Sequence, residues 1–294
     1  MILRYTVPEG ETRKVYNVLR KELAVSSTLV RRLKNFDAIK VDGETAFTDR
    51  ILLAGQTLTV EIDKAEPESD IVPEGGKVDI IYEDDGFLAV NKPAGLIVHP
   101  THSRYTGTLA NFVSGYTKTP VHAVNRLDRD TSGVVLFSKN SYMKYRLIEA
   151  ESEKDYLAVV YGVVPDDEGV VDAPIGRVEE GNILRAVLPD GKSAMTKYKV
   201  VERHDDTTLV SLRLLTGRTH QIRVHMAHLG FPLVGDTLYF SPESKAFSEK
   251  LGIKGQLLHA YRMSIAYPDA DTRLEFRAPI RREEMLRFVS KFEI

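Results

Sequence analysis

One short segment of the chain concentrates side chains that can act as nucleophile, acid or base. Residues 125–140 read NRLDRDTSGVVLFSKN, so a run of charged and hydroxyl residues stands directly before an apolar stretch. The apolar stretch predicts a buried strand, and polar groups at the edge of such a strand are where a rigid scaffold displays reactive side chains. Asp128 is the carboxylate between Arg126 and Arg129. Charged residues also occur in ordinary turns, so this segment alone leaves catalysis and a plain turn both open.

A second group of candidate residues lies within residues 214–239, LLTGRTHQIRVHMAHLGFPLVGDTLY. His225 and His228 are three residues apart and would share a face of a helix predicted at 219–229, which raises the alternative of a metal site. Asp236 is the sole carboxylate of this segment, so packed or phosphate-contacting histidines are the stronger interpretation. The cationic and imidazole candidates are Arg218, His220, Arg223, His225 and His228.

An aromatic residue opens one of the predicted strands. In KDYLAVVYG, residues 154–162, Tyr156 stands where its ring could face a pocket. A tyrosine at such a position is more often part of the core.

Apolar periodicity predicts the elements that hold these residues. Strand-like and helical segments alternate after residue 77, which predicts a mixed sheet with helices. Helices are expected at 141–150, 219–229 and 281–292. The predicted strands are VDIIYED (78–84), FLAVNKP (87–93), GVVLFSK (133–139), KDYLAVVYG, KYKVVER (197–203), LVSLRLL (209–215) and MSIAYP (263–268).

The first part of the chain predicts a small separate module. Val15, Leu19 and Leu23 recur at helical spacing, and Ser26 and Ser27 can cap a second helix. Two strand-like stretches follow, AIKVDG (38–43) and QTLTVEI (56–62). Residues 64–77, KAEPESDIVPEGGK, have the Pro, Gly and charge content of an exposed linker. We therefore expect domains at 1–63 and 78–294, joined by a linker at 64–77.

The charge balance is uneven along the chain. The 294 residues carry a net charge of −2, which by itself argues against nucleic-acid binding. Residues 12–41, however, hold eight basic residues against two acidic ones, Arg31, Arg32 and Lys34 among the basic ones. These side chains could equally coat a solvated helix face. The chain has no cysteine and no apolar run of transmembrane length, so we expect a cytoplasmic protein without disulfides or thiolate metal sites.

Five motifs in series resemble the RluA-type pseudouridine synthase family. They are VNKPAGLIVHP, NRLDRDTSG, EKDYLAVVYG, GRTHQIRVHM with LGFPLVGDTLY, and LLHAYRM. The basic helix followed by IKVDG and LTVEI resembles the S4-like RNA-binding module. The resemblance implies an α+β fold: a small S4-like α/β module, and a catalytic domain built on a long mixed, mostly antiparallel sheet with flanking helices and a central cleft. It also implies isomerisation of uridine to pseudouridine without a cofactor.

The resemblance assigns roles residue by residue. Asp128 matches the catalytic aspartate, Arg223 the arginine that pairs with it, and Tyr156 the tyrosine that stacks on the base and can move a proton. Arg126 matches the arginine that fills the space left by a flipped nucleotide, and Leu258 lines the pocket floor. Arg218, His220, Arg31, Arg32 and Lys34 are expected to contact RNA. Lys92 and Pro93 are expected to shape a loop, with a phosphate contact as the alternative for Lys92.

One position departs from the family pattern, because Asn125 stands where a histidine is expected. An amide can still donate and accept hydrogen bonds, so a loop-anchoring role survives while a role that needs protonation does not. We expect large-subunit ribosomal RNA as substrate, with transfer RNA as the alternative, and no obligate protein partner and no membrane. A non-catalytic RNA-binding protein and a metal-dependent hydrolase built on His220, His225 and His228 are the rival interpretations.

Overall fold

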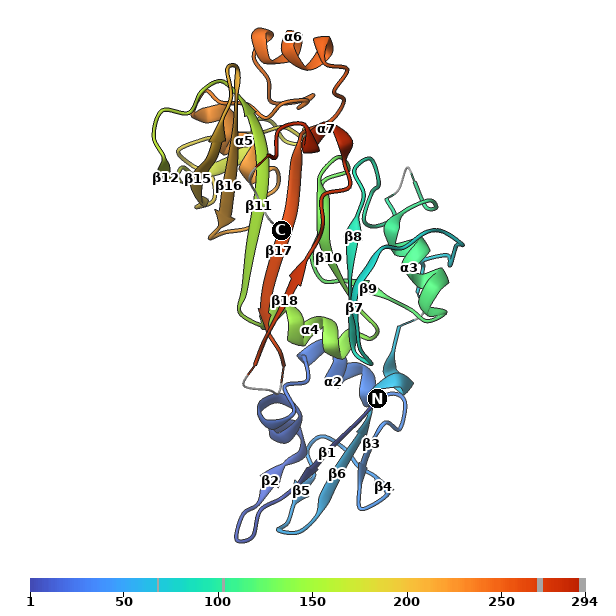
Figure 1. Cartoon of the computed structure of the whole chain (residues 1–294). Coiled ribbons are helices and arrows are strands. Elements are labelled where there is room, and N and C mark those ends of the chain that lie inside the picture. Colours follow the sequence, from blue (N-terminus) through green and yellow to red (C-terminus); the bar gives the residue numbers. More distant parts are fainter. Residues whose placement is uncertain (68, 102–103, 269–271, 291–294) are drawn as a thin grey trace.

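The computed structural model describes the chain except for residues 68, 102–103, 269–271 and 291–294. Among these described residues, no helix combines the length and the apolar character needed to cross a membrane. Figure 1 shows a small β-rich part, formed by the first residues of the chain, below a larger part built on a long twisted sheet.

The small part packs short helical segments on a four-stranded sheet, with the strand order β1-β6-β3-β4. Ser26 caps α2 as predicted, because its hydroxyl accepts a hydrogen bond from the backbone N–H of Leu29. The first predicted helix is shorter than its apolar spacing suggested: it is a three-residue α1 that continues as a π-helical turn, η1. Strand β1 was not predicted. The bounds are β1 Ile2–Thr6, β2 Arg13–Lys14, α1 Val15–Asn17, η1 Val18–Glu22, α2 Ser27–Leu33, β3 Ile39–Val41, β4 Glu44–Thr45, β5 Ile51–Leu52, β6 Thr57–Glu61 and η2 Ile62–Ala65.

The large part is organised by a sheet of ten strands within the described residues. Eight of them run in the order β12-β15-β16-β11-β17-β10-β8-β7, while β9 pairs with β10 and β18 with β17. The mixed, mostly antiparallel sheet is confirmed, since β10 with β17 is the one parallel pair among the described strands. The bounds are β7 Ile80–Glu83, β8 Phe87–Lys92, β9 His122–Ala123, β10 Ser132–Ser138, β11 Ser152–Tyr161, β12 Glu168–Asp172, β15 Met195–Arg203, β16 Thr207–Leu214, β17 Leu258–Ala266 and β18 Arg273–Arg277.

Helices and one hairpin flank this sheet. The predicted final helix at 281–292 is wrong in length: it ends at Leu286, and Phe288 and Val289 continue in turns whose N–H groups bond carbonyls three residues back. Residues 291 and 292 lie outside the described residues. Helices α3 and α6 and the hairpin β13–β14 were not predicted. The bounds are α3 Leu109–Thr117, α4 Ser141–Glu149, β13 Ile175–Arg177, β14 Arg185–Val187, α5 Gln221–His228, α6 Pro242–Lys250 and α7 Glu283–Leu286.

The parallel contact between β10 and β17 requires a glycine. Gly133 lies opposite Ala260 with a φ of +116°, and a Cβ at Gly133 would lie 2.2 Å from the Ala260 carbonyl oxygen. Any larger residue would push the two strands apart. At the preceding position, Ser132 donates a 2.8 Å hydrogen bond to Nδ1 of His259, whose Nε2 donates to the Ala278 carbonyl. The start of β10 is thereby fixed against β17.

Helix α4 joins the two parts of the chain. Tyr142 is buried in the apolar core of the small part, and its hydroxyl donates to the Leu23 carbonyl at 3.0 Å. The Glu66 carboxylate accepts hydrogen bonds from the backbone N–H and the hydroxyl of Ser141, at the N-terminus of α4, and from His122 at 2.6 Å. The segment expected to be an exposed linker therefore contacts the large part through Glu66, and it buries Ile71.

Replacing Glu66 should loosen this junction. Glu66→Gln removes a charge from the N-terminus of α4, and we expect the free energy of unfolding to fall by about 1–3 kcal/mol at pH 7. Burial alone would raise the pKa of the Glu66 carboxyl, but the hydrogen bonds from His122 and Ser141 outweigh burial and hold that pKa below its usual value. Its contribution is thus present above the ordinary carboxyl pKa and is lost as the pH falls through the lowered folded value.

Denaturant titrations of the wild type, Glu66→Gln and the exposed control Glu9→Gln at several pH values test this expectation. The difference between the wild type and Glu66→Gln should shrink below about pH 4.5. A difference that is constant with pH, or one as small as that of the Glu9 control, would contradict the role given to Glu66.

Candidate active site

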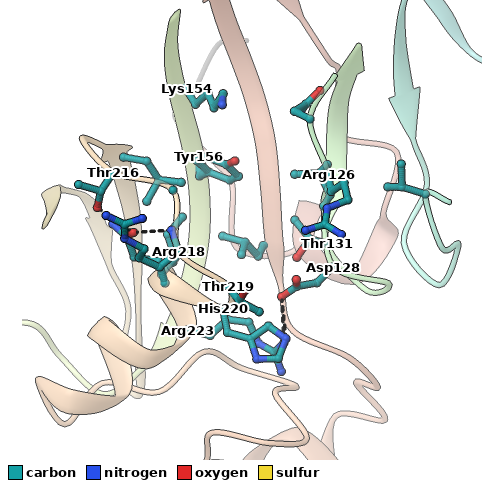
Figure 2. Close-up of a pocket in the computed structure, with 18 of the residues that line it drawn as sticks. Arg126, Asp128, Thr131, Lys154, Tyr156, Thr216, Arg218, Thr219, His220 and Arg223 are labelled. Atoms are coloured by element: carbon teal, nitrogen blue, oxygen red, sulfur yellow. Dashed lines mark hydrogen bonds and ion pairs between the residues drawn. The ribbon is translucent and has the colours of Figure 1, made fainter. Parts of the chain in front are cut away.

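A cavity of about 700 Å³ opens beside the middle of the large sheet. It gathers the loop before β10, the inward face of β11, the start of β17 and the loop that enters α5 (Figure 2). Of the residues predicted from the sequence, the cavity is lined by Asn125, Arg126, Asp128, Tyr156, Arg218, His220, Arg223 and Leu258.

The loop that carries Asp128 is held at both ends by hydrogen bonds from side chains. The Asn125 amide donates to the Val134 carbonyl at 3.2 Å and accepts from the Leu136 N–H at 2.8 Å. At the other end, Gln256 donates to the Thr131 hydroxyl at 3.1 Å. Asparagine at position 125 therefore anchors the loop without needing a protonated ring.

Lys92 supports the same loop from beneath. Its side chain is fully buried, and its Nζ donates to the carbonyls of Pro93, Leu96 and Arg129, each at 2.8 Å. Burial lowers the pKa of Lys92 to about 7, although the charges of Asp130 and Asp128 act in the opposite direction. Three carbonyl acceptors also favour the ammonium form, which has three N–H donors. The sequence-based expectation of a loop-shaping lysine agrees with these contacts.

Asp128 is held by a buried arginine. Arg223, on α5, donates from NH1 to Asp128 Oδ2 at 2.9 Å and grips Asp236 with Nε and NH2 at 2.7 and 2.8 Å. Burial lowers the pKa of the Arg223 guanidinium, but the carboxylates of Asp236 and Asp128 raise it by more than burial lowers it. The pKa therefore lies above its usual value. Oδ1 of Asp128 makes no hydrogen bond with the described residues, so this oxygen is available to a substrate.

Tyr239 and Asp236 complete the support of Arg223. The ring of Tyr239 lies 5.1 Å from the guanidinium carbon of Arg223, close enough for a cation–π contact. Asp236 Oδ1 also accepts from the backbone N–H groups of Leu238 and Tyr239. In the sequence, Asp236 was considered only as a metal ligand and Tyr239 was not singled out. The GDTLY turn was a signal for them, because an aspartate often binds backbone N–H groups that follow it.

His220 faces the same carboxylate from the N-cap of α5. Its Nε2 lies 3.8 Å from Asp128 Oδ2, and its Nδ1 hydrogen-bonds the Tyr239 hydroxyl at 2.8 Å. The same hydroxyl also accepts from the Arg185 N–H, and either tautomer of a neutral His220 can form the contact at Nδ1. Burial lowers the pKa of His220, which favours the neutral form.

Tyr156 and Leu258 form the apolar side of the cavity. Both belong to one buried cluster, on the neighbouring strands β11 and β17. Tyr156 is only 7% exposed, and burial together with the charges of Asp128 and Asp155 raises the pKa of its phenol. The hydroxyl therefore stays protonated at neutral pH.

Two arginines lie at the rim, and three basic residues lie elsewhere. Arg126 and Arg218 are exposed at the cavity, where Arg218 donates to the Ser193 carbonyl at 2.9 Å. Arg31, Arg32 and Lys34 are not brought to the cavity, because they belong to α2 and its end in the small part. Figure 1 shows α2 close to α4, below the large sheet.

The histidines of α5 do not converge on a metal site. Both ring nitrogens of His225 are engaged, Nδ1 with the Thr196 hydroxyl and Nε2 with the Ala173 carbonyl, each at 2.9 Å. His220 faces Asp128 and Tyr239 instead. Among the described residues, no three His, Asp or Glu side chains are grouped so as to hold a metal ion. The arrangement gives no support to a His-based hydrolase.

Comparisons with known proteins agree with this geometry. The family model for RNA pseudouridylate synthase matches residues 86–228. RNA pseudouridine synthase YlyB of Bacillus subtilis is 37% identical over 87% of this chain and 86% of its own length. Ribosomal large subunit pseudouridine synthase D of Xanthomonas campestris is 36% identical over 97% of this chain and 90% of its own. The structure of human RNA pseudouridylate synthase domain containing 1 covers 73% of this chain and 86% of its own, with a TM-score of 0.58 and 26% identity.

The fold and these similarities define the chain as an isomerase that acts on RNA. It belongs to the RNA pseudouridylate synthase family, and the resemblance to its RluA-type members is confirmed at the level of the family.

The support of Arg223 by Asp236 can be tested by mutation. Asp236→Asn keeps the shape but leaves the buried guanidinium with one carboxylate, and it weakens a charge-assisted contact worth about 1.5–3 kcal/mol. If this energy is lost in the transition state, pseudouridine formation should slow by roughly 10- to 150-fold. Rates on cellular RNA that lacks the modification measure this, with Asp190→Asn, an exposed turn residue, as control. Equal rates for the two variants would show that Asp236 does not position Arg223 for the reaction.

Proposed function

We propose that the protein isomerises specific uridines in structured RNA, most of all in large-subunit ribosomal RNA, with Asp128 as the essential carboxylate. The observation that carries this proposal is one arrangement: Asp128 is held by Arg223 and directed into a cavity whose opposite side is formed by Tyr156. Figure 2 shows the phenol of Tyr156, on β11, and the carboxylate of Asp128, on the loop before β10, projecting into the same space.

The reaction needs a group that holds the ribose or the base while the uracil turns. The C1′–N1 bond breaks and a C1′–C5 bond forms, while C5 loses a proton and N1 gains one, so no redox equivalent or energy carrier is consumed. A carboxylate suits this task because it is ionised at neutral pH and is a good leaving group. Asp128 can attack C1′, attack C6 or remove a ribose proton, and its unbonded Oδ1 serves each of these routes.

Arg223 gives Asp128 its orientation. Its charge-assisted contact with Oδ2 holds the carboxylate in one orientation. Asp236 and Tyr239 hold the guanidinium before substrate enters, so Arg223 is preorganised. Preorganised groups of this kind lower a barrier more than groups that must move during the reaction.

Tyr156 offers a flat surface and a hydroxyl to the base. Its buried ring can stack on uracil above Leu258. Because the phenol is protonated, it can accept the C5 proton only if it releases its own hydroxyl proton to another group. Arg126 stands at the rim without an ion pair to the described residues. A planar cation there can fill the gap left when the target nucleotide leaves its stack, a step that costs a few kcal/mol of stacking.

The small part would add affinity through phosphates. Its pattern of a capped basic helix followed by a compact sheet supports an S4-like RNA-binding module, with Arg31, Arg32 and Lys34 as contacts. Similarity to a ribosomal large subunit pseudouridine synthase over 97% of the chain favours ribosomal RNA over transfer RNA. Such a substrate would place the protein in the cytoplasm. A non-catalytic RNA-binding role is the alternative, and it is disfavoured because Asp128, Tyr156 and Arg223 converge.

A pseudouridine map of total RNA tests the proposal. Cells without the gene should lack pseudouridine at specific uridines, and the wild-type gene should restore it. Asp128→Asn should restore nothing, because an amide cannot act as the carboxylate does, whereas Asp167→Asn, 84% exposed and distant from the cavity, should restore the full map. If deletion changes no uridine, the RNA-binding alternative is the better one; if Asp128→Asn restores the map, the assigned carboxylate is wrong.

Tyr156→Phe separates stacking from proton transfer. We expect RNA affinity to stay within about twofold, since the ring is kept, and pseudouridine formation to fall about 100-fold or more if the hydroxyl moves a proton. Because the phenol pKa is raised, Tyr156 does not ionise between about pH 7 and pH 9. Tyr156 should therefore cause no increase in the wild-type rate over that range. Tyr161→Phe, on the same strand, is the control. Equal rates for both variants would leave Tyr156 with stacking alone.

A further inference from the structure

The cavity carries more positive charge than its carboxylate can neutralise. Among the described residues that line it, Asp128 is the single carboxylate, and it is already paired with Arg223. Arg126, Lys154 and Arg218 lie around the cavity on three different segments of the chain, and none of them forms an ion pair with a described residue. A cavity built in this way suits a ligand with several negative charges.

Lys154 is the one of these three cations that the sequence motifs did not identify as a site residue. It stands on β11 two residues before Tyr156, so both side chains leave the same face of the strand, roughly 7 Å apart along it. Figure 2 shows the Lys154 side chain entering the cavity above Tyr156, with Arg126 on the opposite side. Lys154 is half-buried and has no hydrogen-bond acceptor among the described residues. Burial lowers its pKa, as expected of an amine without a compensating anion.

The charged residues on the other face of β11 are paired, unlike Lys154. There Asp155 is gripped by Arg213 and Arg262, with contacts of 2.6 Å to each, and Glu153 lies 3.5 Å from both arginines. The strand thus separates a neutralised set of charges on one face from an uncompensated ammonium on the other. A half-buried charge without a partner is unfavourable for stability, so its placement in the cavity indicates a ligand that supplies the anion.

We propose that Lys154 binds a backbone phosphate of the RNA next to the target nucleotide, while Tyr156 and Asp128 address its base and ribose. This inference rests on the proposed function and adds a substrate contact to it. If the base stacks on Tyr156, the amine lies about one nucleoside away toward the cavity mouth, where the sugar-phosphate backbone of the flipped nucleotide must pass. Lysine acts on phosphate as a compact point charge with rotatable donors, which suits a backbone whose sequence varies.

The test compares Lys154→Met, which keeps the apolar stem, with Lys154→Arg and with Lys199→Met, which removes an exposed lysine of β15 outside the cavity. The probe is RNA purified from cells that lack the gene. Rates of pseudouridine formation at increasing enzyme concentration give the half-saturating concentration and the maximal rate, and a potassium chloride series gives the salt dependence. Thermal unfolding confirms that each variant is folded.

For Lys154→Met we expect a rise of about tenfold in the half-saturating concentration, a smaller change in the maximal rate, and a salt slope shallower by about one ion. Lys154→Arg should recover most of the affinity, and Lys199→Met should match the wild type. A lower maximal rate with an unchanged salt slope would overturn the inference, because it indicates a contact with the base. Unchanged affinity and slope would overturn it as well. If the wild type itself forms no pseudouridine, the proposed function fails instead.

Discussion

The buried guanidinium of Arg223 is the constraint around which the site is arranged. A charge removed from water is strongly unfavourable unless it is paired and hydrogen-bonded, so the chain must supply anions at fixed positions around α5. The side-chain exposure rises from 0% for Asp236 through 5% for Arg223 to 29% for Asp128. The inner carboxylate neutralises and orients the arginine, and the outer one is oriented by it while one oxygen stays open to the cavity. Asp236 in the core thus fixes Arg223, and Arg223 in turn fixes Asp128, the reactive group that faces the cavity.

The sheet sets the distance across which this group works. Asp128 precedes β10 and Tyr156 lies on β11, and β17 stands between the two strands in the sheet. The approach of β10 to β17 depends on the missing side chain of Gly133, and Ser132 and His259 lock the register beside it. Lys92 and Asn125 then fix the loop that leads into β10, through backbone carbonyls and one N–H. The carboxylate is therefore held by side chains that bond the main chain in and beside its loop, and by Arg223 from α5.

The sequence was most informative where a local pattern decides the structure. The central strands β8 and β10 are buried along their whole length, so their apolar runs were recognised, and the site residues lie in compact motifs beside such runs. Helix α6, PESKAFSEK, was missed because its two buried residues are serines and it has no apolar stripe. The hairpin strands β13 and β14 have three residues each, too few for a visible alternation. The role of Asp236 was not predicted, because its partner Arg223 is set by tertiary packing. Lys154 was not singled out, because the apolar run after it hides the alternation that places it on the same face as Tyr156.

The distribution of charge explains how a chain of net charge −2 can be suited to RNA. Exposed charges act over about 8–10 Å at physiological salt, so the charges near a bound strand matter and the sum over the molecule does not. On β11 the acidic residues Glu153 and Asp155 face away from the cavity and are consumed by Arg213 and Arg262, while the next residue on the cavity face is Lys154. A strand has a period of two, so one backbone can present opposite electrostatic surfaces to its two sides. The two carboxylates of β11, Glu153 and Asp155, thus do little to reduce the positive potential of the cavity, because Arg213 and Arg262 pair with them on the other face of the strand.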